Sequence, residues 1–133
     1  MIIFNVVKTP AEKWTEIVNK YKKQCQEILK ISSNVRYAGV INLYGRTLTG
    51  IINPKLKPLL KSEQVKNEFF ILSNLMTLRK DSAISIGKLE HVILYHQKIT
   101  IVLFQKNNIT HYISINRKAK NLEKIISSIK KII

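Results

Sequence analysis

Apolar residues recur at helical spacing in three stretches of this chain, and the first stretch has a well-marked start. Thr9 can cap the first turn, Pro10 suits the first helical position, and Glu12 is placed to complete a capping box. The apolar residues that follow form a stripe wide enough to lie across a sheet. They are Trp14, Ile17, Val18, Tyr21, Cys25, Ile28 and Leu29. We expect this helix to end near residues 32–34.

Two more helices are expected, over Ser62 to about Lys80 and over Ala119 to Ile133. One face of the middle helix carries Val65, Phe69, Leu72, Leu75 and Met76. Phe70 lies outside that face. A helix that is covered on one side only does not need this extra aromatic residue, so we expect a second surface to pack on the helix. The last helix carries an isoleucine-rich stripe, whose spacing outweighs the weak helix propensity of isoleucine.

Five stretches have the composition of β-strands. Two of them form a hairpin between Val35 and Ile52, with its turn at residues 44–46, and Asn53-Pro54 ends the second arm. Gly39 and Gly50 within this hairpin indicate a bulge or the close approach of a helix. Three further strands are expected over Leu89–Gln97, Ile99–Gln105 and Ile109–Asn116. The whole chain, 1–133, is thus predicted to be one α+β domain of order α-β-β-α-β-β-β-α.

The composition adds a strong positive charge to this picture. The 133 residues include 23 Lys and Arg against 8 Asp and Glu, a formal net charge of +15. Such an excess suits an anionic partner, although a general bias toward Lys, Ile and Asn explains it equally well. The single cysteine, Cys25, excludes an internal disulfide and is typical of a reducing cytoplasm. We expect residues 1–8 to form an N-terminal arm rather than a signal peptide, and we find no apolar run long enough to span a membrane.

Residues that could carry catalysis are scattered. His91 and His96 are expected on opposite sides of one strand, His111 lies on another, and the glutamates are dispersed. Asp81 is the only aspartate, and the four glycines do not form a phosphate-binding loop. We therefore expect neither an enzyme nor a bound metal or cofactor.

The order of elements and the first hairpin resemble those of the roadblock/dynein light chain family, which belongs to the wider profilin-like group. The hairpin match covers Val35 to Leu48, and the overall resemblance extends from about Thr9 to the end of the chain. The stretches Val35–Val40 and Ile86–Lys88 are also similar to those of an uncharacterised family of small proteins from ammonia-oxidising archaea. The strong basic charge and the N-terminal arm are departures from the roadblock pattern.

The roadblock resemblance implies a five-stranded antiparallel sheet with the middle helix on one face and the terminal helices on the other. It also implies homodimers, in which the middle helix and the third strand meet their copies, and small Ras-like GTPases as partners. The positions that match this interface are Phe69, Phe70, Met76, Glu90, His91, Val92, Ile93 and Leu94. The preferred interpretation is accordingly a non-catalytic, dimer-forming protein-interaction module.

Two alternatives remain open from the sequence. The first is a basic nucleic-acid-associated protein, because each Lys or Arg placed against a phosphate adds affinity at low salt. The candidate anion- or partner-binding residues are Lys55, Lys57, Lys61, Arg79, Lys80, Lys88, Arg117, Lys118 and Lys120. The sequence does not decide whether they share one end of the sheet. The second alternative is a small-molecule sensor with a pocket between the sheet and a helix.

Overall fold

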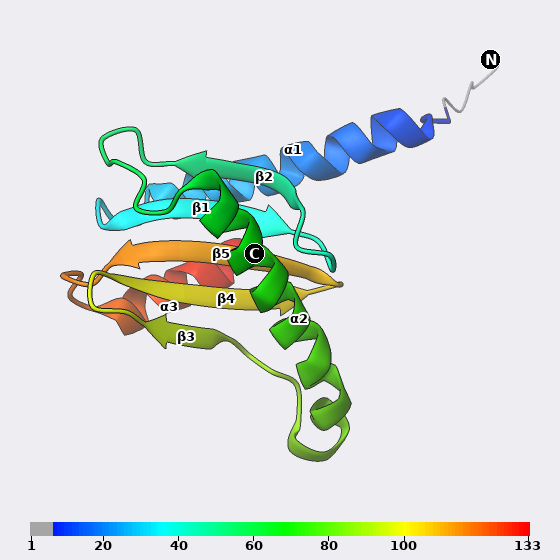
Figure 1. Cartoon of the computed structure of the whole chain (residues 1–133). Coiled ribbons are helices and arrows are strands. Elements are labelled where there is room, and N and C mark those ends of the chain that lie inside the picture. Colours follow the sequence, from blue (N-terminus) through cyan, green and yellow to red (C-terminus); the bar gives the residue numbers. More distant parts are fainter. Residues whose placement is uncertain (1–6) are drawn as a thin grey trace.

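The computed structural model describes residues 7–133 and contains the predicted helices and strands in the predicted order (Figure 1). The helices are α1 (Pro10–Leu29), α2 (Ser62–Ile86) and α3 (Leu122–Ile132). The strands are β1 (Val35–Ile41), β2 (Thr47–Ile52), β3 (Val92–Tyr95), β4 (Ile99–Lys106) and β5 (Ile109–Asn116). They form one antiparallel sheet in the order β2-β1-β5-β4-β3. The predicted arm lies outside the described residues except for Val7 and Lys8, which are exposed.

The sheet separates two hydrophobic cores. On one face α2 packs over the sheet through Phe69, Leu72 and Met76. On the other face α1 and α3 lie side by side and contribute, among others, Cys25 and Ile129 (Figure 1). Because β1, β4 and β5 are covered on both faces, most of their residues are buried, including the polar Thr110, His111 and Ser114 of β5. The layered arrangement implied by the roadblock resemblance is confirmed.

Several element boundaries differ from the predictions, including the start of α3 at Leu122 instead of Ala119 and the end of β3 at Tyr95 instead of Gln97. Helix α2 does not end near Lys80 as predicted; it continues through Asp81 and Ser82 to Ile86 and stops where Gly87 adopts a φ of +91°. Strand β3 begins at Val92 instead of Leu89, because its pairing with β4 starts at Val92 and Leu103. Helix α1 ends at Leu29, before the predicted residues 32–34.

The first half of α1 extends beyond the sheet (Figure 1). Cys25 and Ile28 are fully buried against the sheet, whereas Trp14 is 53% exposed and Ile17 is 44% exposed. The apolar stripe therefore packs on the sheet in the second half of α1 but not in its first two turns. The helix has 20 residues and is about 30 Å long. The capping box formed by Thr9 and Glu12 sets its first turn, which lies beyond the edge of the sheet.

The glycine positions of the hairpin are explained by an aromatic ring. Gly39 and Gly50 are direct cross-strand partners, and the ring of Tyr37 lies against both of them. A Cβ atom would lie 2.3 Å from the Tyr37 hydroxyl oxygen at Gly39 and 2.1 Å from it at Gly50. The predicted close approach is real, but it comes from Tyr37 and not from a helix. A register shift between Val40 and Ile41 supplies a bulge farther along the same strand.

The hairpin turn itself rests on α2. Gly45 has a φ of +78°, and a Cβ atom there would lie 2.8 Å from the carbonyl oxygen of Phe69 and from the backbone nitrogen of Phe70. Only glycine combines this backbone conformation with such a close approach. The turn is therefore in close contact with the backbone of α2 at Phe69 and Phe70.

Candidate functional site

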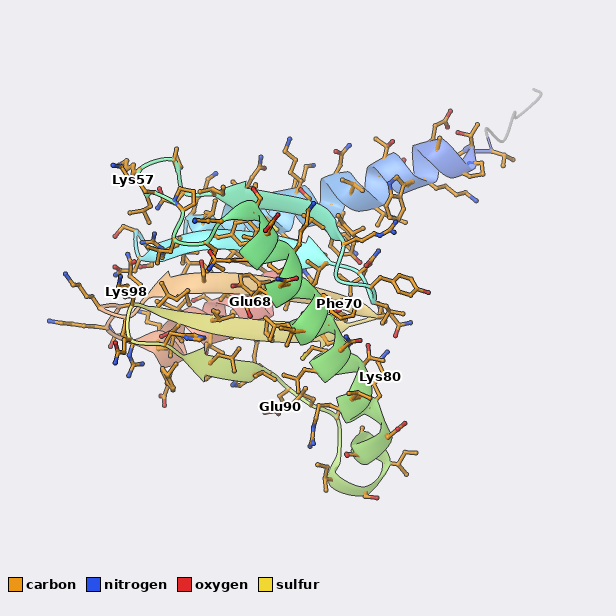
Figure 2. The ribbon with its side chains drawn as sticks, in the orientation of Figure 1. Lys57, Glu68, Phe70, Lys80, Glu90 and Lys98 are labelled. Carbon is orange, nitrogen blue, oxygen red and sulfur yellow. The ribbon has the colours of Figure 1, made fainter. Side chains whose placement is uncertain are left out.

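The outer face of α2 carries large apolar side chains that belong to neither hydrophobic core. Phe70, Ile71, Leu78, Ile84 and Ile86 are between 59% and 93% exposed. The ten residues from Phe69 to Leu78 contain no charged side chain, although 23% of the chain is charged. A helix that covers a sheet normally carries charged residues on its outer face. The outer face of α2 is thus an unusually apolar exposed surface, and Figure 2 shows Phe70 on it.

The predicted interface residues of this helix divide between the core and the surface. Phe69 is 4% exposed and Met76 is 1% exposed, because both lie in the core between α2 and the sheet. Of the three residues named from the sequence, Phe70 alone is available to a partner. Sequence reasoning missed Ile71 and Leu78, which a helical wheel places on the same side as Phe70, about 100° and 80° away from it.

The second predicted part of the interface is the edge strand β3. Among residues 7–133 its only neighbour in the sheet is β4, so within this part of the chain its other edge carries unpaired backbone N–H and C=O groups. Val92 and Leu94 pack toward α2, and Ile93 packs toward the opposite core; all three are half-buried. In the segment before the strand, Glu90 is exposed, and His91 is half-buried with its ring 5.8 Å from that of Phe104.

The candidate cationic residues do not share one end of the sheet. The strand directions bring four connecting segments to one end: 30–34, 53–61, 96–98 and 117–121. These segments contain eight cations and no carboxylate: Lys30, Lys55, Lys57, Lys61, Lys98, Arg117, Lys118 and Lys120. We call the surface formed by these eight residues the cationic end. The other three candidates lie near the opposite end of the sheet: Arg79, Lys80 and Lys88. The Lys80 side chain donates a hydrogen bond to Asn108 Oδ1 there. Figure 2 shows Lys57 and Lys98 far from Lys80.

Burial favours the neutral forms of the titratable side chains in the interior, where the rings of Tyr37 and Tyr112 contact each other with centroids 5.9 Å apart. Burial raises the pKa of the Cys25 thiol to about 11, so this cysteine is not a thiolate nucleophile at neutral pH. Burial, together with the positive charge of Lys106, lowers the pKa of His111 to about 4. Among residues 7–133, no three His, Cys, Asp or Glu side chains are grouped so that they could hold a metal ion. In the same part of the chain, no helix is both long and apolar enough to cross a membrane.

No model of a known protein family matches the sequence, and no curated protein sequence is significantly similar to it. Solved structures, in contrast, are similar over most of the chain. The gliding protein MglB from Thermus thermophilus is 12% identical, with a TM-score of 0.70 over 96% of this chain and 88% of that chain. A structure described as MglB with a tetrameric arrangement is 14% identical, with a TM-score of 0.67 over 96% of this chain and 87% of that chain.

A third similar structure carries the name of the predicted fold. The roadblock/LC7 domain from Streptomyces avermitilis is 10% identical, with a TM-score of 0.60 over 83% of this chain and 92% of that chain. At these identities the likeness concerns the fold. The resemblance to the archaeal family stays a prediction. The element order, the sheet topology and these likenesses together show that the chain has a roadblock/LC7 fold.

Proposed function

We propose that this protein is a non-catalytic interaction module that forms a homodimer through the outer face of α2 and the free edge of β3. The observation that carries the proposal is the run of exposed apolar side chains on a stretch of α2 without charges. Exposed apolar patches of this kind mark protein–protein contact sites. A two-fold axis would bring Phe70, Ile71 and Leu78 of both copies together, because such an interface uses the same patch twice.

The energetics are adequate for a dimer of moderate affinity. Each of these side chains is 59–70% exposed, so its burial contributes roughly 1–2 kcal/mol. The summed burial energy of six such side chains, three from each copy, exceeds the lower estimates of the free-energy cost of association, which are about 4 kcal/mol. Pairing of the two β3 edges would satisfy the free backbone groups and extend the sheet across both copies. The tetrameric arrangement described for the similar MglB structure supports self-association of this fold.

The partner class is a small Ras-like GTPase, which the roadblock resemblance implies, and the role is regulation or scaffolding. The side chains that could carry catalysis are dispersed along the sequence, which supports a role in binding. Capture of partners from a native lysate, repeated after nuclease treatment, tests this class. A guanine-nucleotide-binding protein retained after nuclease treatment supports the proposal, and loss of all partners after nuclease treatment contradicts it.

Light scattering during size-exclusion chromatography tests the dimer directly. We expect a mass of twice 15.4 kDa for the wild type and of 15.4 kDa for Phe70→Asp. Trp14→Asp is the matched control, because Trp14 is a comparably exposed aromatic residue on α1, and this variant should remain dimeric. A monomeric wild type at about 100 µM, or a dimeric Phe70→Asp, refutes the proposed interface. Circular dichroism checks that each variant is folded.

The cationic end favours one alternative, a protein that associates with nucleic acid. Eight cations without a nearby carboxylate in their segments form a surface suited to a phosphate backbone. Fluorescence anisotropy with labelled duplex DNA and RNA at 50 and 200 mM salt tests it. We expect Lys118→Gln combined with Lys120→Gln to reduce the salt dependence, whereas Lys22→Gln combined with Lys23→Gln on α1 should not. Absence of binding at 50 mM salt excludes this alternative.

A further inference from the structure

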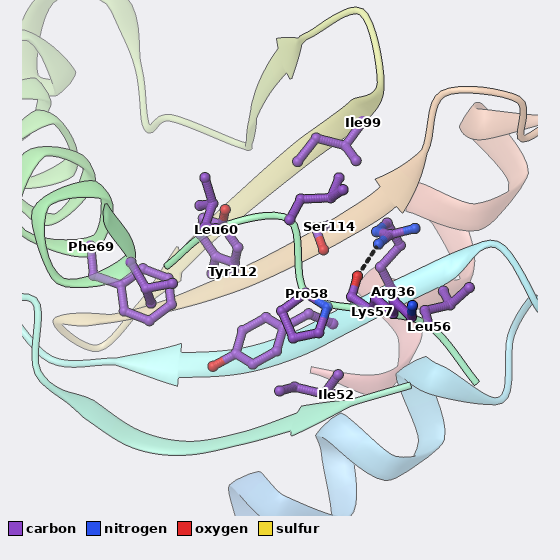
Figure 3. A pocket seen from close by; sticks show the side chains of 13 residues that line it. Arg36, Ile52, Leu56, Lys57, Pro58, Leu60, Phe69, Ile99, Tyr112 and Ser114 are labelled. Atoms are coloured by element: carbon purple, nitrogen blue, oxygen red, sulfur yellow. Dashed lines mark hydrogen bonds between the residues drawn. The ribbon is translucent and has the colours of Figure 1, made fainter. Parts of the chain in front are cut away.

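An apolar pocket opens beside the cationic end, away from the outer face of α2 (Figure 3). It has a volume of about 170 Å³ and lies between the segment 53–61, the start of α2 and the α2-side face of the sheet. Its wall is made mainly by Tyr37, Leu56, Leu60, Phe69 and Tyr112. A dry cavity of about 150 Å³ lined by similar side chains binds benzene in another protein. The pocket therefore has the size and the surface for one aromatic ring.

One cation is built into the wall of this pocket. The Arg36 guanidinium donates from one terminal nitrogen to Asn116 Oδ1 at 2.8 Å. From the other terminal nitrogen it donates to the carbonyl oxygen of Lys57 at 2.7 Å, as Figure 3 shows. Both acceptors are neutral, and no carboxylate of residues 7–133 forms an ion pair with Arg36. A guanidinium has five N–H donors, so three remain for another group. Arg36 is thus a fixed and uncompensated positive charge beside an apolar cavity.

We propose that this pocket binds a small aromatic carboxylate, with the ring among the apolar side chains and the carboxylate on Arg36. Arginine is suited to this role because its planar fork matches the two oxygens of a carboxylate. The cationic end around the pocket adds attraction for an anion. A nucleobase fits less well, because its several polar edge groups would face a wall in which eight of the thirteen lining side chains carry no polar atom. The inference does not depend on the proposed dimer, since the pocket and the outer face of α2 are separate surfaces.

The test uses 3-phenylpropionate as the probe, titrated into the isotope-labelled wild-type protein and followed by NMR. We expect saturable shifts at Val65, Ser114 and Ile99, which line the pocket, and none at Phe70. Two analogues separate the contributions of the ring and the charge. The neutral 3-phenyl-1-propanol should bind about tenfold more weakly, because it lacks the charge-assisted hydrogen bonds. Acetate, which lacks the ring, should not cause saturable shifts in the pocket.

Variants assign the charge to Arg36. Arg36→Gln should reduce the affinity for the probe about tenfold, to that of the neutral analogue. Lys120→Gln removes one positive charge from the cationic end outside the pocket and should retain the affinity nearly unchanged. Val65→Phe should fill the pocket and abolish binding. Equal binding of the acid and the alcohol by the wild type, or shifts outside the pocket, overturns the proposal without any need for a variant.

Discussion

The buried histidine of β5 makes the stability of the fold depend on pH. His111 is 2% exposed, its ring meets Tyr21 edge-on at 5.8 Å, and its Nε2 atom lies 3.0 Å from Gln24 Oε1. Its Nδ1 atom is buried without a hydrogen-bond partner among the described residues. Protonation of Nδ1 would place a charge and an unpaired donor in the core beneath α1. Burial and the nearby Lys106 consequently lower the pKa of His111 from 6.5 to about 4.

The size of the effect follows from this difference in pKa. Between pH 6.5 and pH 4 the unfolded chain binds a proton at His111 that the folded chain does not bind, so stability decreases as the pH falls. One pKa unit corresponds to about 1.4 kcal/mol. Relative to pH 7.5, the free energy of unfolding should therefore decrease by about 2 kcal/mol at pH 5 and by about 3 kcal/mol at pH 4 from this group alone.

Urea denaturation at pH 7.5, 6 and 5 measures this contribution when the wild type is compared with His111→Phe. Phenylalanine keeps a ring against Tyr21 and cannot be protonated. The carboxylates are the same in both proteins, so their titration cancels in the difference. We expect this difference to change by about 2 kcal/mol in favour of the variant between pH 7.5 and pH 5. His96→Gln removes an exposed histidine and serves as the control. Parallel pH profiles of wild type and His111→Phe would refute the reasoning.

Two further predictions concern packing. Gly50→Ala places a Cβ against the Tyr37 ring and should cost about 1–3 kcal/mol. In a Tyr37→Leu background the same change should cost less than about 1 kcal/mol, and equal costs in this double-mutant cycle would show that the ring is not the obstacle. Met76→Ala should destabilise the monomer by about 2–5 kcal/mol, because Met76 is 1% exposed. Phe70→Ala should change the free energy of unfolding of the monomer by less than about 0.5 kcal/mol, measured by denaturation at low protein concentration. A loss of stability as large as that of Met76→Ala would contradict the orientation of α2.

The sequence predicts the elements well wherever the core enforces them. Strand β5 runs from Ile109 to Asn116 as predicted, since it is paired on both sides and covered on both faces. The predictions fail where elements extend past the sheet. Trp14 and Ile17 have the same spacing as the buried residues of α1, but spacing does not reveal where the sheet ends. Asp81 is tolerated within α2 because its side chain is exposed there.

The candidate site was partly predictable. The odd position of Phe70 on the middle helix correctly indicated an apolar residue outside the core. Phe69 and Met76 were assigned to the same interface through the resemblance, whereas the burial of both shows that they stabilise the single chain. The sequence analysis considered a pocket between the sheet and a helix, but it did not reveal the place of Arg36 in its wall, because that depends on hydrogen bonds to Asn116 and Lys57 from distant segments.

The stretch of α2 without charges has a consequence for ionic strength. Each copy of the chain carries a formal charge of +15, so two copies repel each other before they touch. They can meet along Phe69–Leu78 without bringing like charges into direct contact. Added salt shortens the Debye length to about 10 Å at 0.1 M, which weakens the remaining repulsion. Self-association through α2 should therefore become tighter as salt is added, whereas any affinity for nucleic acid should decrease. One series of salt concentrations thus distinguishes the two roles.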